Sequence, residues 1–137
     1  YPSTAGNYKE NSALRPYNVY GWTKLWSENF VKLLKNYIII RTRFFDKKNI
    51  RFKTAATDIF TSMIEVGTLV QEIKYISLIK FNGIVNVGKE RTSDFANYKK
   101  YKLSIKPCKR KDITKNLNFK IAKDASMNLN LLKKLKK

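Results

Sequence analysis

The sequence predicts an α/β fold whose strands run parallel. Two short β-branched runs, at residues 37–42 (YIIIRT) and 84–87 (IVNV), alternate with stretches whose apolar residues recur at helical spacing. The first run is continuously apolar over its first four residues, as in a strand that is buried on both faces. Alternation of helices with such strands favours parallel pairing, because a parallel pair needs a crossover connection.

The remaining elements follow from periodicity and turn signals. Residues 1–18 are rich in turn formers, residues 46–52 (DKKNIRF) form a polar loop, and Asn82-Gly83 forms a turn. Thr92, Ser93 and Asp94 can cap a helix. Helices are expected at residues 19–36, 53–64, 68–80 and 94–100, with a last amphipathic piece at 128–135. The two predicted strands are too few for a complete doubly wound sheet.

Composition excludes several kinds of site. The 137 residues suffice for one domain and contain no His and one Cys, Cys108. A His-based triad, a His metal ligand, a Cys cluster for zinc and an internal disulfide are therefore excluded, and no metal site is expected. A lone Cys fits a reducing compartment, so a cytoplasmic protein is expected. The longest uncharged apolar run, residues 37–40, is far shorter than a membrane helix, so no membrane association is expected.

The chain is strongly basic, with a formal net charge of +19. Lys outnumbers Arg 23 to 6, although Arg is better suited to bidentate contacts with phosphates and bases. The positive residues are scattered, and the densest runs are residues 106–111 and 131–137. We therefore expect only nonspecific attraction to nucleic acid, and a basic nucleic-acid-binding module remains an alternative hypothesis.

One pair of residues carries chemistry. Tyr20 and Lys24 are four residues apart at the start of the first helix, so their side chains share a face. An ordinary phenol has a pKa of ~10 and exchanges protons poorly near neutral pH. A nearby ammonium group favours the phenolate, which lets the pair act as a general acid/base toward a carbonyl or alcohol oxygen. The ammonium can also bind a ribose hydroxyl of a cofactor.

Five segments in series resemble a known enzyme family. They are residues 6–10 (GNYKE), 16–28 (PYNVYGWTKLWSE), 38–42 (IIIRT), 83–91 (GIVNVGKER) and 123–129 (KDASMNL). The second is similar to the P-x-N-x-Y-G-x-T/S-K-x-x-G-E pattern of extended short-chain dehydrogenase/reductases that act on nucleotide sugars. The series looks most like the dTDP-4-dehydrorhamnose reductase branch, which serves dTDP-rhamnose biosynthesis, and it runs across nearly the whole chain.

The resemblance implies a reaction and roles. Tyr20 would be the catalytic acid/base, and Lys24 its electrostatic partner and cofactor-ribose ligand. A hydride would pass from NADPH or NADH to a sugar C4 carbonyl, and Tyr20 would protonate the oxygen. Arg41 and Thr42 would contact the cofactor at the carboxyl end of a strand, where open α/β sheets bind ligands. The resemblance assigns substrate binding to Arg43 and Arg91.

Departures from the pattern define which part of the fold is present. The cofactor-binding G-x-x-G-x-x-G loop is absent from these residues, and the third catalytic hydroxyl would fall just before Tyr1. Ser27 and Asn128 replace an expected Gly and Asp. We therefore expect the C-terminal part of a Rossmann-like, NAD(P)-binding fold with a small substrate-binding region. Residues 1–137 would form one partial domain: 1–45 hold the active-site helix and following strand, and 46–137 the substrate side.

Three further questions stay open. The same Tyr–Lys pair serves nucleotide-sugar epimerases and dehydratases, which the sequence does not separate from reductases. A non-catalytic subunit that retains the fold is a further alternative, which Tyr20 and Lys24 argue against. Trp22 and Trp26 share a helix face, so they either pack in the core or anchor a homodimer through the active-site helix, as the resemblance suggests.

Overall fold

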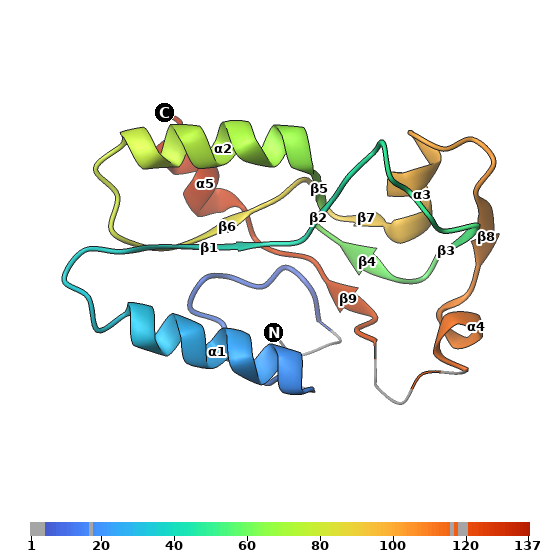
Figure 1. Cartoon of the computed structure of the whole chain (residues 1–137), viewed down its shortest axis with the longest axis horizontal. Helices are drawn as coiled ribbons and strands as arrows, with labels where there is room; N and C mark the ends of the chain where they lie inside the picture. The colour runs from blue at the N-terminus through green and yellow to red at the C-terminus, as the bar shows by residue number, and fades with distance from the viewer. Residues whose placement is uncertain (1–4, 17, 116, 118–120) are drawn as a thin grey trace.

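The computed structural model describes residues 5–16, 18–115, 117 and 121–137, and it is an α/β structure. Its larger part is built on two parallel strands, β1 (Ile38–Thr42) and β6 (Gly83–Val87). They pair in register from Ile38 opposite Gly83 to Thr42 opposite Val87. Helices α2 (Val66–Leu78) and α5 (Asn130–Leu135) lie on one side of this pair, and α1 (Val19–Val31) lies on the other (Figure 1). The parallel α/β class predicted from the sequence is confirmed.

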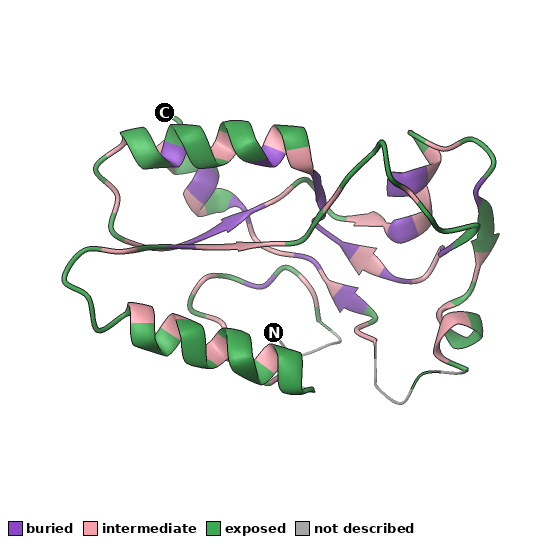
Figure 2. Cartoon of the chain, in the orientation of Figure 1, coloured by how far each residue is buried: buried purple, intermediate pink, exposed green. Residues whose placement is uncertain are grey.

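The main hydrophobic core lies between the strand pair and the α2–α5 side. Its buried members come from β6, from the two helices and from the residues directly before α2 (Figure 2). The side chain of Glu65 caps α2 by accepting a hydrogen bond from the backbone N–H of Thr68 at 3.2 Å. Helix α2 is held both by this cap and by the burial of Leu69 and Ile76 in the core. The core members are Ile64, Leu69, Ile76, Val85, Val87 and Leu132.

A smaller part follows the carboxyl ends of β1 and β6 (Figure 1). It consists of very short strands that pair over long sequence distances, with a second buried cluster of Ala55, Met63, Tyr98 and Ile105. Strand β4 lies between β7, antiparallel to it, and β9, parallel to it, whereas β2 pairs with β5 and β3 with β8, both in parallel. The elements are β2 (Phe44–Phe45), β3 (Thr54–Ala56), β4 (Phe60–Thr61), β5 (Ile64–Glu65), β7 (Thr92–Ser93), α3 (Asp94–Lys99), β8 (Lys106–Cys108), α4 (Arg110–Thr114) and β9 (Asp124–Ala125).

The helix expected at residues 53–64 is wrong. The structure has β3, β4 and the start of β5 there. The segment contains Thr54, Thr57 and Thr61, whose β-branched side chains favour extended backbone. Backbone pairing with β8, β7 and β9 then overrides the local helical spacing. The sequence alone contains little trace of these partners, because each strand is only two or three residues long.

The other helices agree with the prediction, with one difference in length. Helices at 68–80 and 94–100 are confirmed as α2 and α3, and Ser93 caps α3 by accepting from the N–H of Ala96 at 3.1 Å. The first helix was expected to reach Asn36 but ends at Val31, with Lys32 as its C-cap. Residues 32–36 form turns instead.

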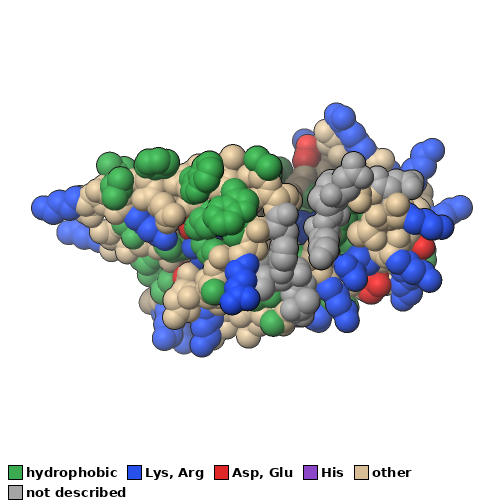
Figure 3. Space-filling view, turned by 90° about the horizontal axis from the view of Figure 1, so that it is seen from below, with side chains coloured by type: hydrophobic (Ala, Val, Ile, Leu, Met, Phe, Trp, Pro, Cys, Tyr) green, Lys and Arg blue, Asp and Glu red, His purple; other side chains and the backbone are tan. Residues whose placement is uncertain are grey.

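Helix α1 has no buried residue. Trp22 and Trp26 are 46% and 58% exposed, so they do not pack in the core of this chain. With Phe30, and with Leu33 in the turn that follows the helix, they form an apolar stripe on the outside of the molecule, which we call the α1 stripe (Figure 3). Among the described residues, no helix combines the length and the apolarity that crossing a membrane requires.

Candidate functional site

The N-terminus of α1 presents the Tyr20–Lys24 pair. Asn18 has an extended backbone, and its side-chain oxygen accepts a hydrogen bond from the N–H of Gly21 at 2.8 Å, which starts the helix at Val19. Tyr20 and Lys24 are consequently one turn apart, and Lys24 Nζ lies 5.3 Å from the centre of the Tyr20 ring. Tyr20 is 71% exposed, so its hydroxyl is open to a ligand.

A bidentate ion pair connects α1 to β1. Arg41 donates from Nε to Glu28 Oε1 at 2.8 Å and from Nη2 to Glu28 Oε2 at 2.6 Å. Both side chains are largely buried, at 10% and 16% exposure. Arg41 Nη1 also donates to the backbone carbonyl of Glu10 at 2.8 Å. Such two-point pairing fixes orientation as well as distance, so the pair holds α1 on the strand.

The segments that carry the resemblance meet in space. The N–H of Tyr8 donates to the carbonyl of Ser126 at 3.0 Å, and the N–H of Asn128 donates to the carbonyl of Tyr8 at 2.8 Å. Asn86, fully buried in β6, donates its backbone N–H to the Glu10 carboxylate at 3.0 Å and its side-chain amide to the Tyr8 carbonyl at 2.9 Å. Residues 6–10, 83–91 and 123–129 are thus joined by hydrogen bonds.

The predicted cofactor residues Arg41 and Thr42 end β1, as expected. The N-terminal end of α1, with Tyr20, lies toward the same end of the strand (Figure 1). The hydroxyl oxygen of Thr42 is buried and has no hydrogen-bond partner among the described residues. A buried hydroxyl without a partner is uncommon, and it leaves a donor and an acceptor available at this strand end. The Arg41 guanidinium, in contrast, already binds protein groups.

The predicted substrate residue Arg43 pairs with a buried carboxylate. Its Nη2 donates to Asp94 Oδ2 at 3.2 Å, and Thr61 Oγ1 donates to Asp94 Oδ1 at 3.4 Å. Burial raises the pKa of Asp94, although the positive charge and hydrogen bond of Arg43 oppose the change. Burial also raises the pKa of the neighbouring Tyr98. The Arg43 side chain is 46% exposed, so part of its guanidinium can reach a ligand.

Arg43, Asp94 and Tyr98 line a cavity of about 530 Å³. Its other walls are mainly apolar, with contributions from Phe52 and Ile59. The lining residues come from residues 43–59, 94–113 and 121. A largely apolar cavity with a few polar groups at one end is typical of a small-molecule site.

Arg91 lies outside this cavity, in a different cluster. Its Nε donates to Asp124 Oδ2 at 2.7 Å, and its guanidinium carbon lies 3.8 Å from the centre of the Phe60 ring. Burial of Asp124 would raise its pKa, but hydrogen bonds from the backbone and side chain of Ser126 and the ion pair with Arg91 outweigh it and lower the pKa. Arg43 therefore binds Asp94 at the start of α3, directly after β7, whereas Arg91 binds Asp124 in β9, the other neighbour of β4.

Three residues of the site escaped the sequence analysis as individuals. Glu28 is the last residue of the segment 16–28 that resembles the family pattern, but it was assigned no role of its own. Asp94 was treated only as part of a helix cap, and Tyr98 was not singled out. A polar residue on an otherwise apolar helix face could have flagged both. Among the described residues, no group of three or more acidic or sulfur ligands could hold a metal ion.

Similar solved structures are dTDP-4-dehydrorhamnose reductases. A hypothetical dTDP-4-dehydrorhamnose reductase from Sulfolobus tokodaii matches with a TM-score of 0.76 and 26% identity, over 96% of this chain and 56% of that chain. The enzyme from Clostridium acetobutylicum matches with a TM-score of 0.78 and 20% identity, over 96% and 56%. The enzyme from Bacillus anthracis, in complex with NADP, matches with a TM-score of 0.75 and 23% identity, over 93% and 52%.

The chain thus spans about half the length of these structures. Its fold matches the C-terminal part of their Rossmann-like fold, which confirms the predicted fold class and the resemblance. No protein-family model and no curated protein matches the chain.

Proposed function

We propose that this chain forms the active-site helix and the substrate side of an NAD(P)-dependent nucleotide-sugar reductase of the dTDP-4-dehydrorhamnose reductase type. The observation that carries the proposal is the exposed Tyr20–Lys24 pair, which a capped helix presents at the carboxyl end of β1. The similar solved structures support the fold in which such a pair would act.

Proton transfer falls to Tyr20. Its hydroxyl gives a proton to the carbonyl oxygen of the sugar, and solvent then restores that proton. Lys24 Nζ is close enough to the ring to stabilise negative charge on the phenolate oxygen. The ion pair between Glu28 and Arg41 positions Tyr20 and Lys24, because it fixes α1 on β1.

The residues at the end of β1 fit a nicotinamide cofactor. A bound NADPH or NADH supplies the hydride that reaches the carbonyl carbon. The Thr42 hydroxyl, which has no partner among the described residues, and the Lys24 ammonium offer contacts to its polar groups. Arg41 stays a predicted cofactor ligand, although its nitrogen atoms already bind Glu28 and Glu10. The pyrophosphate would be held by residues outside these 137, because no Gly-rich loop of the required spacing occurs in them.

The nucleotide-sugar substrate fits the cavity lined by Arg43. The half-exposed guanidinium of Arg43 suits an anionic diphosphate, and the apolar walls around Phe52 and Ile59 suit a flat base. The carboxylates of Asp94 and Asp112, which also line the cavity, suit the hydroxyl groups of the sugar. Arg91 would contact the substrate from the neighbouring cluster with Asp124. A nucleotide-sugar epimerase or dehydratase would use the same pair of residues, so product analysis with dTDP-, GDP- and UDP-sugars decides among these reactions.

The α1 stripe also supports the predicted homodimer. Two indole rings, Trp22 and Trp26, lie 6.5 Å apart between centres and are largely exposed, as is Phe30. Exposed aromatic clusters are the usual anchors of protein interfaces. We propose that a second copy of α1 covers them.

The decisive experiment measures reduction of dTDP-4-dehydrorhamnose by NADPH with the whole polypeptide that contains these residues. Tyr20→Phe keeps the ring and removes the acid, so kcat should fall at least ~100-fold, as for loss of a general acid. Substrate affinity should stay within ~2-fold. Tyr101→Phe is the matched control, because Tyr101 is also exposed (43%) but packs against Phe45 and does not line the cavity. Retention of kcat in Tyr20→Phe would contradict the proposal.

A further inference from the structure

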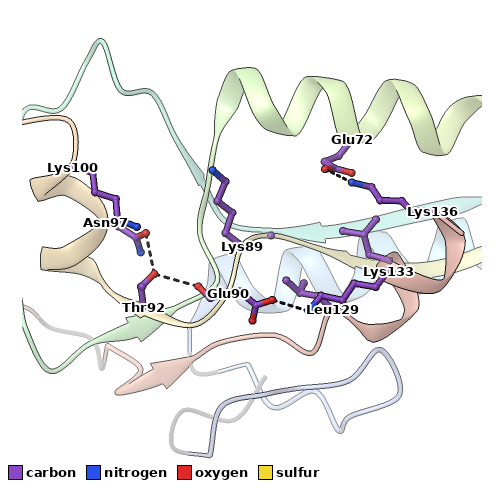
Figure 4. Close-up of a pocket in the computed structure, with 11 residues that line it drawn as sticks. Glu72, Lys89, Glu90, Thr92, Asn97, Lys100, Leu129, Lys133 and Lys136 are labelled. Carbon is purple, nitrogen blue, oxygen red and sulfur yellow. Dashed lines mark hydrogen bonds and ion pairs between the residues drawn. The ribbon is translucent and has the colours of Figure 1, made fainter.

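A second cleft lies on the α2–α5 side of the strand pair, away from the Tyr20–Lys24 pair. It has a volume of about 380 Å³ and lies between α2, α3, α5 and the segment that follows β6 (Figure 4). Leu129 and Leu132, both buried, form its apolar floor. The roles assigned above to the reductase site use none of its residues.

The cleft carries a net positive charge after its ion pairs are accounted for. Lys133 Nζ binds Glu90 Oε1 at 2.7 Å, and Lys136 Nζ binds Glu72 Oε1 at 2.6 Å, so these four charges cancel in pairs. Lys89 and Lys100 also line the cleft. Within the described part of the chain, no hydrogen bond or ion pair engages the ammonium group of either. Two positive charges are therefore left facing one cleft.

Two walls of the cleft also carry buried polar atoms without partners. Asn97 is 6% exposed, its Oδ1 accepts from Thr92 Oγ1 at 3.0 Å, and its Nδ2 has no partner among the described residues. On the α2 side, Glu72 Oε2 likewise has none, although Oε1 binds Lys136. Buried polar groups are almost always hydrogen-bonded, so each such atom requires an explanation. A ligand that accepts at one end and donates at the other satisfies both.

We propose that this cleft binds a small hydroxylated phosphomonoester, a sugar phosphate in chemical class. A phosphomonoester carries about −1.5 to −2 charges at neutral pH, which matches the two ammonium groups of Lys89 and Lys100. Its hydroxyl groups donate to the free oxygen of Glu72, and its carbon skeleton packs on Leu129 and Leu132. A neutral sugar lacks the charge, and inorganic phosphate lacks the carbon skeleton that packs on Leu129 and Leu132 and the sugar hydroxyl groups that reach Glu72.

The arrangement differs from scattered surface lysine in one respect. The paired lysines, Lys133 and Lys136, are each tied to a carboxylate on the α5 side of the concavity. Lys100 lies on the opposite, α3 side, and Lys89 lies between the two sides (Figure 4). A diffuse positive field of +19 would attract any anion equally over the surface. A built site instead loses affinity only when its own residues change.

The test is calorimetric titration of the protein with ribose 5-phosphate at ~0.15 M salt, where the field of distant exposed charges is largely screened. The double variant Lys89→Gln/Lys100→Gln should bind at least ~10-fold more weakly, since it removes both charge-assisted hydrogen bonds to the phosphate. The control Lys32→Gln/Lys35→Gln removes the same charge from exposed positions after α1 and should bind within ~2-fold of the wild type.

A single substitution tests the hydroxyl contact. Glu72→Gln should weaken ribose 5-phosphate but strengthen or leave unchanged the binding of inorganic phosphate, because the change removes a negative charge near the anion. Equal weakening by both double variants would overturn the proposal in favour of the diffuse field, as would equal affinity for ribose and ribose 5-phosphate. Absence of binding at millimolar ribose 5-phosphate would also overturn it. None of these readouts depends on reductase activity.

Discussion

Helices α1 and α2 are each 13 residues long and lie on opposite sides of the same strand pair, yet they are held in different ways. Helix α2 buries Leu69 and Ile76 in the main core. Helix α1 buries nothing, and its aromatic stripe faces outward. The comparison shows that an amphipathic pattern predicts which face of a helix is apolar but not whether the same chain covers that face.

Polar contacts replace burial at α1. The Asn18 cap fixes its first turn, and the Glu28–Arg41 pair fixes its middle against β1. This arrangement suits a helix that must keep Tyr20 and Lys24 open to ligands. It also implies that the stability of the chain depends on the α2 side, whereas the placement of Tyr20 and Lys24 depends on very few contacts.

The largest effect on stability is expected from shortening a buried side chain of α2. Ile76→Ala removes a fully buried side chain from the main core and should lower the free energy of unfolding by about 2–5 kcal/mol. Phe30→Ala, on the 69% exposed stripe of α1, should change it by less than ~0.5 kcal/mol. Urea denaturation followed by circular dichroism measures both. Equal losses would mean that α1 is packed as tightly as α2.

A smaller loss is expected from breaking the tie between α1 and β1. Glu28→Gln leaves the buried Arg41 guanidinium without its charged partner, which should cost about 2–3 kcal/mol, because hydrogen bonds to charged groups contribute on this scale. The near-ultraviolet circular dichroism of Trp22 and Trp26 reports the local loss of order. Glu90→Gln is the matched control, since Glu90 is 81% exposed in its pair with Lys133. A control that costs as much as Glu28→Gln would contradict the assigned role.

The same contrast explains what the sequence could predict. Strands β1 and β6 were predictable, because each contains three β-branched apolar residues within a five-residue strand. The start of α1 was predictable from its cap and spacing. The strands within residues 53–64 were not, because two or three residues gain their conformation only from distant partners such as β8 and β9. The cleft lined by Lys89 and Lys100 could not be predicted from the sequence for a related reason. Its lining residues come from segments up to 64 positions apart, as in the Glu72–Lys136 pair.

The α1 stripe gives the next prediction. If a second copy covers it, Trp26→Glu places a charge in that interface and should convert the dimer to a monomer in sedimentation equilibrium. The free energy of unfolding of the monomer should change by less than ~0.5 kcal/mol, because Trp26 is 58% exposed in the chain. Val70→Glu on α2 is the control, since Val70 is 53% exposed on the opposite side. A wild type that is monomeric at all concentrations would contradict the proposed homodimer.

The smallest effects are expected from the carboxylates of Asp94 and Asp124. The two should change the stability of the chain in opposite directions as the pH rises. Because the pKa of Asp94 is raised by burial, the folded state binds its proton more tightly than the unfolded state. Its contribution is full below the ordinary carboxyl pKa of ~4 and is lost as pH rises through the raised pKa. Asp124, whose hydrogen bonds lower its pKa, contributes above ~pH 4, and that contribution is lost as pH falls through the lowered pKa.

Two conservative variants separate these contributions. Asp94→Asn keeps an acceptor for Arg43 and should remove the loss of stability on the rising side of ~pH 4, whereas Asp124→Asn should remove the loss on the acid side. Urea titrations at a series of pH values from about 2.5 to 7 measure both slopes. Identical pH profiles for the two variants would show that Asp94 and Asp124 lie in equivalent surroundings, and would contradict the conclusion that, of these two carboxyl groups, burial raises the pKa of Asp94 alone.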